Sequence, residues 1–364
     1  MRAFVEVNLN AISNNINLIK SKTQAEILAV VKADAYGHGL IPVAKCAISA
    51  GATWLGVALL EEAISLRESG ISVPIISWLN PPSSDFKKAI ELDIDLGVPS
   101  LKHLELIIEV GKVLGKKPRV HIEVDTGMTR GGLLDEWSDF LIVAPGAEIE
   151  VVGFWSHFAR ADEPDEVANQ SQLLEFEKKL AELVGIGITP EYIHLANSAA
   201  TLTNPNSHKS IVRLGIAMYG LSPDIETMGI SRDLKLEPAM TLKAEIQLVK
   251  RVPVGSPVGY GGTQITLQDT KLAIIAMGYA DGIPRNTSSA AGIFVAGRKA
   301  AIIGRVSMDQ FVVDLGADSN AIAGEIVEVF GGLGYSIDDW ATAAGTINYE
   351  IVTRIASRVP RIYA

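Results

Sequence analysis

The chain has 364 residues, of which 48% are hydrophobic and 20% are charged, and its formal net charge is −10. This length exceeds one ordinary domain and suits a large barrel followed by a smaller domain. The acidic balance argues against non-specific binding to nucleic acid, and no apolar run is long enough to predict a membrane span. We therefore expect neither a nucleic acid nor a membrane as a partner.

The first residues and the cysteine content indicate the compartment. The N-terminal MRAFVEVNLN has no long apolar stretch with a cleavage site, so we expect no secretory signal. Cys46 is the only cysteine, which excludes an internal disulfide and fits a reducing environment. We expect a cytoplasmic protein.

Strand and helix patterns alternate over the first 220 or so residues, in the manner of a (β/α)8 barrel. A helix is predicted over 10–20, where Ile12, Ile16 and Ile19 recur at helical spacing. An open, doubly wound sheet has the same local pattern. The predicted strands are 27–31, 53–59, 74–79, 93–98, 119–124, 151–156, 192–195 and 211–214, with helices at 61–69 and 101–114.

The positions of the polar residues favour the barrel. Side chains that could take part in catalysis or binding lie just beyond the carboxyl ends of the predicted strands, namely Lys32, Arg130, His157, Ser198 and Arg213. In a barrel these strand ends form one face, on which active sites lie, whereas in an open sheet they spread along an edge.

The pattern changes at about residue 236 to short strands separated by glycine and proline, which predicts a mainly-β domain. Two helices are expected to close the chain, with Ser336 and Asn348 as their N-caps. The fold class is therefore α/β, with an N-terminal barrel over 1–232 and a mainly-β C-terminal domain over 233–364. The predicted strands are 240–249, 272–277, 292–296, 300–305, 311–314 and 326–330.

The segment EILAVVKADAYGHGL, residues 26–40, contains the strongest candidate nucleophile. The apolar run 27–31 predicts a buried parallel strand, and Lys32 follows where that strand leaves the core. Partial burial lowers the pKa of an ammonium and frees the amine, as in lysines that form Schiff bases with pyridoxal phosphate. The alternative is a lysine that extends along the surface with its charge in water.

VVKADAYGHG resembles the cofactor-lysine segment of alanine racemases, and the resemblance runs from about residue 4 to 363. It implies a homodimeric enzyme with shared active sites that uses pyridoxal 5′-phosphate, and no metal, to interconvert L- and D-alanine (EC 5.1.1.1) for peptidoglycan. Other segments match the family in order: DTGMTRGG, WSHFARAD, ANSAA, VRLGIAMYG, PVGYGGTQI, GYADG, GRVSMDQ and TINYEIVTRIASRVPR.

The resemblance implies a cofactor site around Lys32. Arg213 would donate to the ring nitrogen with support from His194, and His157 would lie near the ring. An arginine there disfavours a second positive charge on the ring nitrogen, which weakens the electron sink and favours racemisation over transamination. Taken singly, Ser198 fits a helix cap, His157 a structural histidine and Arg213 an ion pair at the barrel rim. The remaining cofactor-binding residues would be Tyr36, Asn197, Ser198, Gly215, Ile216 and Tyr349.

Racemisation removes a proton from one face of the α-carbon and returns it to the other, so an acid/base group is needed on each side. The resemblance assigns one face to Lys32 and the other to Tyr260 of the partner subunit; on its own, Tyr260 fits an aromatic in a hairpin turn. Arg130 and the backbone N–H of the partner's Met308 would face the substrate carboxylate. The entryway would include Tyr279, Arg305, Asp162 and Arg285.

Two positions depart from the family pattern. Many members carry a carbamylated lysine seven positions before this arginine, where the chain has Glu123. We expect Glu123 to supply the anion itself, because an unpaired and partly buried Arg130 would cost several kcal/mol. Gly131 stands where leucine is frequent, and we expect a small change in packing there.

Three rival functions share the scaffold. A serine or broad-spectrum racemase is the nearest alternative, because one methylene discriminates substrates by only about 10–200-fold. A decarboxylase of basic amino acids or diaminopimelate would need a thiol from the β domain, whereas Cys46 lies in the barrel. A cofactor carrier without activity would not need both Lys32 and Tyr260.

Overall fold

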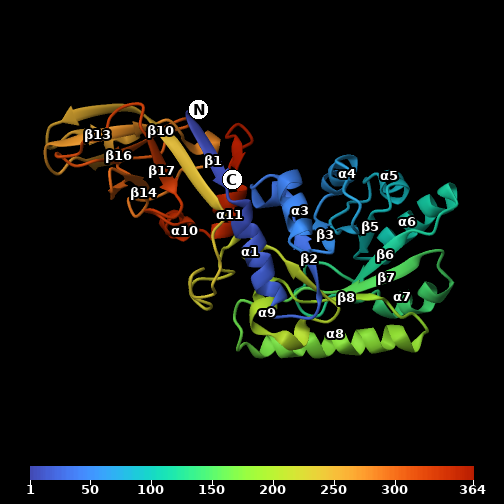
Figure 1. Ribbon diagram of the computed structural model, residues 1–364. Helices are drawn as coiled ribbons and strands as arrows, with labels where there is room; N and C mark the ends of the chain where they lie inside the picture. The colour runs from blue at the N-terminus through green and yellow to red at the C-terminus, as the bar shows by residue number, and fades with distance from the viewer. The chain divides into compact units, whose positions relative to one another are not determined.

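The computed structural model describes residues 1–364 as two compact units. The first contains Ile12–Ala35 and Leu40–Glu237, and the second contains Met1–Ala11, Tyr36–Gly39 and Pro238–Ala364 (Figure 1). The break between Glu237 and Pro238 lies close to the domain boundary predicted after residue 232. The two short N-terminal segments fold with the C-terminal part of the chain.

The sheet of the first unit has eight parallel strands in the order β8-β7-β6-β5-β4-β3-β2-β9. Its two ends come together, because Ser210 N–H donates to the Ile193 carbonyl at 3.1 Å and Arg213 N–H to the Ala196 carbonyl at 2.9 Å. The predicted barrel is confirmed. Its strands are β2 (Glu26–Val30), β3 (Trp54–Val57), β4 (Ile75–Ser77), β5 (Asp95–Val98), β6 (Arg119–Glu123), β7 (Glu150–Trp155), β8 (Tyr192–His194) and β9 (Ile211–Leu214).

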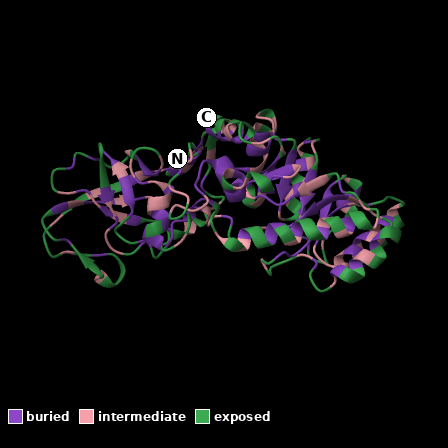
Figure 2. Cartoon of the chain, turned by 90° about the horizontal axis from the view of Figure 1, so that it is seen from below, coloured by how far each residue is buried: buried purple, intermediate pink, exposed green.

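Helices follow the strands and cover the outside of the barrel, with α8 along one flank (Figure 1). The strands are buried and the outer sides of the helices are exposed (Figure 2). None of the helices combines the length and apolar character needed to cross a bilayer. Segment α2 (Lys32–Tyr36) is a left-handed turn rather than a regular helix. The helices are α1 (Leu9–Lys20), α3 (Leu40–Ser49), α4 (Leu60–Glu68), α5 (Phe86–Glu91), α6 (Leu101–Leu114), α7 (Trp137–Val143), α8 (Val167–Gly185) and α9 (Ser198–Thr203).

The second unit is mainly β, as predicted. Its large sheet has the order β15-β14-β17-β10-β1-β18, with β13 and β16 beside β10. Strand β1 pairs antiparallel with β10 and parallel with β18, so the two chain termini lie side by side (Figure 1). The strands are β1 (Ala3–Val7), β10 (Met240–Val252), β11 (Pro257–Val258), β12 (Gln264–Ile265), β13 (Thr270–Ile275), β14 (Gly292–Val295), β15 (Arg298–Ala301), β16 (Phe311–Asp314), β17 (Ile326–Phe330) and β18 (Arg361–Tyr363).

The two C-terminal helices differ in how well their caps were predicted. Ser336 caps α10 (Ile337–Ala344), and its Oγ accepts from Asp339 N–H at 3.0 Å. The prediction for α11 (Asn348–Thr353) was wrong, because the N-cap is Ile347. Asn348 lies inside the helix, where its Nδ2 donates to Asp338 at 2.8 Å, so a tertiary contact uses the side chain that a cap would need.

Candidate active site

Lys32 stands two residues beyond the end of β2 and is half-buried. The backbone after it is left-handed, with φ between 52° and 54° from Ala33 to Tyr36. Residues other than glycine adopt this conformation at a cost of about 1–2 kcal/mol each. Local contacts must therefore hold the turn in place.

Two carboxylates provide such contacts. Glu62, in the first turn of α4, accepts from Ala33 N–H at 2.6 Å, and its other oxygen accepts from Ala58 and Leu59 N–H at 3.1 and 3.0 Å. Asp34 accepts from Leu40 N–H at 2.8 Å. Glu62 therefore links the residue next to Lys32 to the start of the following βα loop. Sequence reasoning missed this role, although a glutamate in the third position of a helix is a known capping signal.

The surroundings of Lys32 favour its neutral form. Burial lowers the pKa of the Lys32 ammonium, the positive charges of Arg130 and Arg213 lower it further, and Glu62 acts in the opposite direction. A lowered pKa increases the fraction of free amine, which is the form that attacks carbonyls and accepts protons.

Arg213 lies in β9 and is buried among hydrogen-bond acceptors. Its Nη1 donates to Nδ1 and the carbonyl of His194 at 3.0 and 2.9 Å. Its Nη2 donates to the carbonyls of Ser156 and Leu195 at 2.8 and 3.0 Å and to His157 Nδ1 at 3.1 Å. These bonds use the two terminal nitrogens and leave the Nε–H as the remaining donor. The alternative ion pair at the barrel rim is not formed, and burial lowers the pKa of Arg213 to about 9.

The two histidines on Arg213 are neutral acceptors. Burial and the charge of Arg213 lower the pKa of both His157 and His194 well below the ordinary value. Because a guanidinium only donates, the Nδ1 atoms of both rings accept. Gln172, on α8, fixes the loop of His157: its amide donates to the His157 carbonyl at 3.1 Å, and its oxygen accepts from Ala159 N–H at 2.9 Å.

The segments that follow β8 and β9 meet at Ser198. Its Oγ accepts from Gly215 N–H at 2.9 Å and from Ala217 N–H at 3.3 Å. Ile216 lies between these two residues, and Asn197 caps α9 by accepting from Ala200 N–H at 3.0 Å. A hydroxyl together with neighbouring backbone N–H groups is a suitable environment for a phosphate dianion.

Glu123 and Arg130 do not form the expected ion pair. Arg130 is exposed, so water solvates its charge and the burial cost that motivated the expectation does not arise in the single chain. Glu123 ends β6, where burial raises the pKa of its carboxyl to about 7 against the opposing charges of Arg130 and Arg213. A Cβ on Gly131 would lie 3.3 Å from Glu123 Oε1, so the glycine leaves room for this carboxylate. The two departures from the family pattern are therefore coupled.

The second unit contains five more of the predicted residues, namely Tyr36, Tyr260, Tyr279, Met308 and Tyr349. The rings of Tyr36 and Tyr349 lie 6.3 Å apart, and burial raises the pKa of Tyr36. Tyr260 is 71% exposed and Met308 is 54% exposed. Tyr279 N–H donates to the Ser307 carbonyl at 3.0 Å and Ala280 N–H to that of Met308 at 2.9 Å, so the loops of Tyr279 and Met308 are joined.

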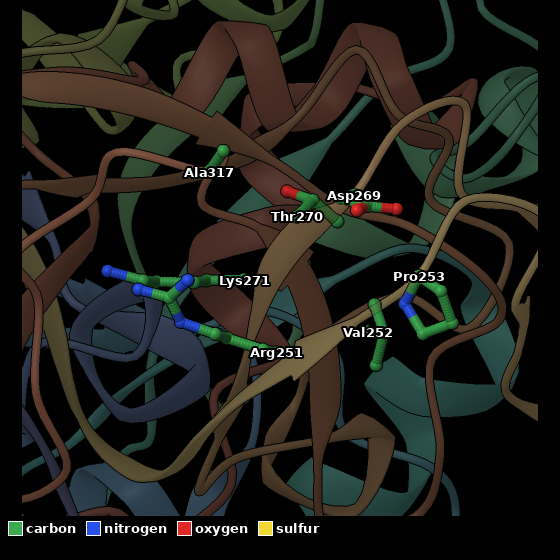
Figure 3. Close-up of a pocket in the computed structure, with 7 residues that line it drawn as sticks. All are labelled: Arg251, Val252, Pro253, Asp269, Thr270, Lys271 and Ala317. Atoms are coloured by element: carbon green, nitrogen blue, oxygen red, sulfur yellow. The ribbon is translucent and has the colours of Figure 1, made fainter.

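A separate hollow in the second unit is lined by residues outside the predicted set (Figure 3). Two of its charged groups already have partners in the chain, since Lys271 Nζ donates to the Ser319 carbonyl at 2.5 Å and Asp269 accepts from Val254 N–H at 2.9 Å. We assign no ligand to it. The lining residues are Arg251, Val252, Pro253, Asp269, Thr270, Lys271 and Ala317.

Comparisons with known proteins identify the family. A family profile described as "Alanine racemase, N-terminal domain" matches residues 7–223, and "Alanine racemase, C-terminal domain" matches residues 239–363. The alanine racemase of Salinispora tropica is 46% identical, over 100% of this chain and 98% of its own length.

Solved structures give the same result. The alanine racemase from D-cycloserine-producing Streptomyces lavendulae superposes with a TM-score of 0.97 at 43% identity, over 100% of this chain and 97% of that one. The alanine racemase of Streptomyces coelicolor A3(2) has a TM-score of 0.96 at 44% identity, over 100% and 98% of the two chains. These comparisons do not favour the serine or broad-spectrum alternative.

Proposed function

We propose that the chain, which belongs to the alanine racemase family and is an amino-acid racemase, interconverts L- and D-alanine with pyridoxal 5′-phosphate as cofactor. In this proposal it acts as a cytoplasmic homodimer and supplies D-alanine for peptidoglycan. The observation that carries the proposal is the arrangement on the barrel's strand ends. A lysine with a lowered pKa lies in the electrostatic field of a buried arginine whose Nε–H is left over for a ligand.

The chain's own groups fit this cofactor. Lys32 would hold it through its amine, and the Ser198 hydroxyl, the Gly215 backbone and the Ile216 N–H would bind its phosphate together with Tyr36 and Tyr349. Arg213 would donate to its ring nitrogen while His194 and His157 keep the guanidinium oriented. When bound, pyridoxal 5′-phosphate withdraws electrons from the substrate's α-carbon and makes its proton acidic.

Two groups would then move protons. Lys32 Nζ, as a free amine, takes or returns the proton on one face of the α-carbon. The partner subunit's Tyr260 acts on the opposite face, and its high exposure in the single chain is consistent with a role at another chain's site. Arg130 and the partner's Met308 N–H bind the substrate carboxylate, and Tyr279 lines its approach.

Mixed dimers test this division of labour. Lys32→Ala and Tyr260→Phe homodimers each lose racemase activity. When the two variants are unfolded, mixed and refolded together with cofactor, every mixed dimer has one site with both wild-type residues, provided that Tyr260 serves the other subunit. Activity should therefore return. If both bases come from the same chain, each mixed site lacks one of them and the mixture stays inactive, which would refute the proposal.

A further inference from the structure

A chain of hydrogen-bonded side chains continues from Arg213 through the interior of the barrel. His194 Nδ1 lies 3.0 Å from Arg213 Nη1, and its Nε2 lies 2.9 Å from His121 Nδ1. His121 Nε2 lies 3.3 Å from Asp95 Oδ2. Both histidines are 0% exposed, Asp95 2% and Arg213 4%. Asp95 is the first residue of β5, so the chain of contacts leads from the opposite end of the strands to the candidate site.

The direction of these hydrogen bonds follows from the groups at the two ends. Arg213 can only donate, so His194 Nδ1 accepts and the proton of the neutral ring lies on Nε2. His194 Nε2–H then donates to His121 Nδ1, which places the proton of His121 on Nε2. That proton points at Asp95, whose carboxylate accepts. One arrangement of neutral rings therefore satisfies every member.

The barrel is shaped around this path. A Cβ on Gly153 would lie 1.8 Å from His121 Nδ1, so only glycine at this position of β7 leaves space for the ring. Gly153 is the partner of His121 in the register of β6 and β7. The ring of Trp54 packs edge-on against His121, with 5.4 Å between the ring centroids. The ring of Trp155 stacks on His194 with 5.7 Å between the centroids, and these contacts fix both imidazoles.

Asp95 is kept as an anion at the end of the path. Arg119 donates to its two oxygens at 2.8 and 3.1 Å. Burial favours the neutral acid, but the hydrogen bonds from His121 and Arg119 outweigh burial and hold the pKa of Asp95 below its ordinary value. The carboxylate is therefore a permanent acceptor at neutral pH.

We propose that Asp95, His121 and His194 form a relay of fixed hydrogen-bond direction that positions Arg213 for the cofactor. Asp95 and His121 act as positioning residues through His194. With the opposite tautomer, His194 would present an N–H to the guanidinium, and Arg213 would lose one of the bonds that orient it. The functional part of this inference rests on the proposed function, from which Arg213 takes its role.

Nitrogen NMR of the cofactor-loaded protein labelled with ¹⁵N-histidine tests the relay directly, with signals assigned by their loss in single variants. We expect His121 and His194 at neutral pH to be neutral and protonated on Nε2. A proton on Nδ1 of either ring, or an imidazolium, would overturn the proposal. This measurement uses the wild-type protein and does not depend on any variant folding.

The His121→Phe variant keeps an aromatic ring, somewhat larger than the imidazole, and removes both hydrogen bonds. We expect a mixture of tautomers at His194 and a kcat about tenfold lower, as is usual when the partners of a site residue are removed, with an unchanged KM. The control is His208→Phe, which also removes a buried histidine with two hydrogen bonds. The control should keep the wild-type kcat and the His194 signal.

A folded His121→Phe protein with wild-type kcat would overturn the positioning role. If the wild-type protein shows the expected tautomers but has no racemase activity, the proposed function fails while the relay itself stands. If the protein racemises alanine but the histidines have other tautomers, the relay fails while the proposed function stands.

Discussion

Replacing Glu123 by glutamine removes a half-buried charge while keeping the shape of the side chain. Burial raises the pKa of this carboxyl from 4.5 to about 7. At 1.36 kcal/mol per pKa unit, the ionised form destabilises the folded chain by about 3 kcal/mol at most. The folded pKa is the higher one, so between pH 4.5 and 7 the folded chain holds a proton that the unfolded chain has released. Stability therefore falls as the pH rises through this window.

Thermal unfolding at several pH values measures this effect. At pH 8 the Glu123→Gln protein should melt higher than the wild type by up to about 4 °C, and at pH 4 the two should agree. Protein and cofactor concentrations must be held constant, because binding and association also shift the melting temperature. The matched control is Glu148→Gln, a surface carboxylate 60% exposed, whose pH dependence should follow the wild type. Parallel curves for Glu123→Gln and the wild type would refute the burial argument.

The same variant tests whether the charge of Glu123 serves Arg130. If it does, kcat/KM for alanine falls while stability rises, the combination expected of a charge that is kept for function at the expense of stability. Wild-type activity in Glu123→Gln would show that the negative charge is not what orients Arg130.

Three further substitutions test the local geometry. Glu62→Ala removes the acceptor of three backbone N–H groups and should lower the free energy of unfolding by about 2–4 kcal/mol, so an unchanged urea midpoint would contradict its role at the Lys32 turn. Gly131→Ala should lower the melting temperature in the wild type but not in a Glu123→Ala background, where the added Cβ no longer meets the carboxylate; equal effects in both backgrounds would exclude the coupling. Gly153→Ala drives a Cβ into the His121 ring and should destabilise the barrel by about 3 kcal/mol, which a melting temperature close to that of the wild type would disprove.

The barrel could be predicted because its strands are continuous apolar runs with polar residues at their ends. The strand at Ile211–Leu214 and the helix at Leu101–Leu114 have the predicted bounds. The N-cap of α11 could not be predicted, because the side chain of Asn348 contacts a residue of another helix. Nor does the composition of Ala33–Tyr36 indicate a left-handed turn, since no glycine or asparagine occurs in it.

Some residues of the candidate site could likewise be identified from the sequence, and others could not. Lys32 and Arg213 could be identified because a barrel brings the ends of its strands to one face. His121 and Asp95 could not, because they lie within strands and their contacts depend on the order and register of neighbouring strands. The role of Tyr260 depends on a second chain, and it comes from the family resemblance alone.

The central claim is that the chain racemises alanine with an acid/base group on each face of the α-carbon. The most direct test incubates the cofactor-loaded protein with L-alanine in D2O, while circular dichroism follows the optical activity and proton NMR follows the α-proton. We predict loss of optical activity together with deuterium at the α-carbon. Deuteration with retained optical activity would mean that only one face is served, and no exchange with cofactor bound would contradict the assignment to alanine.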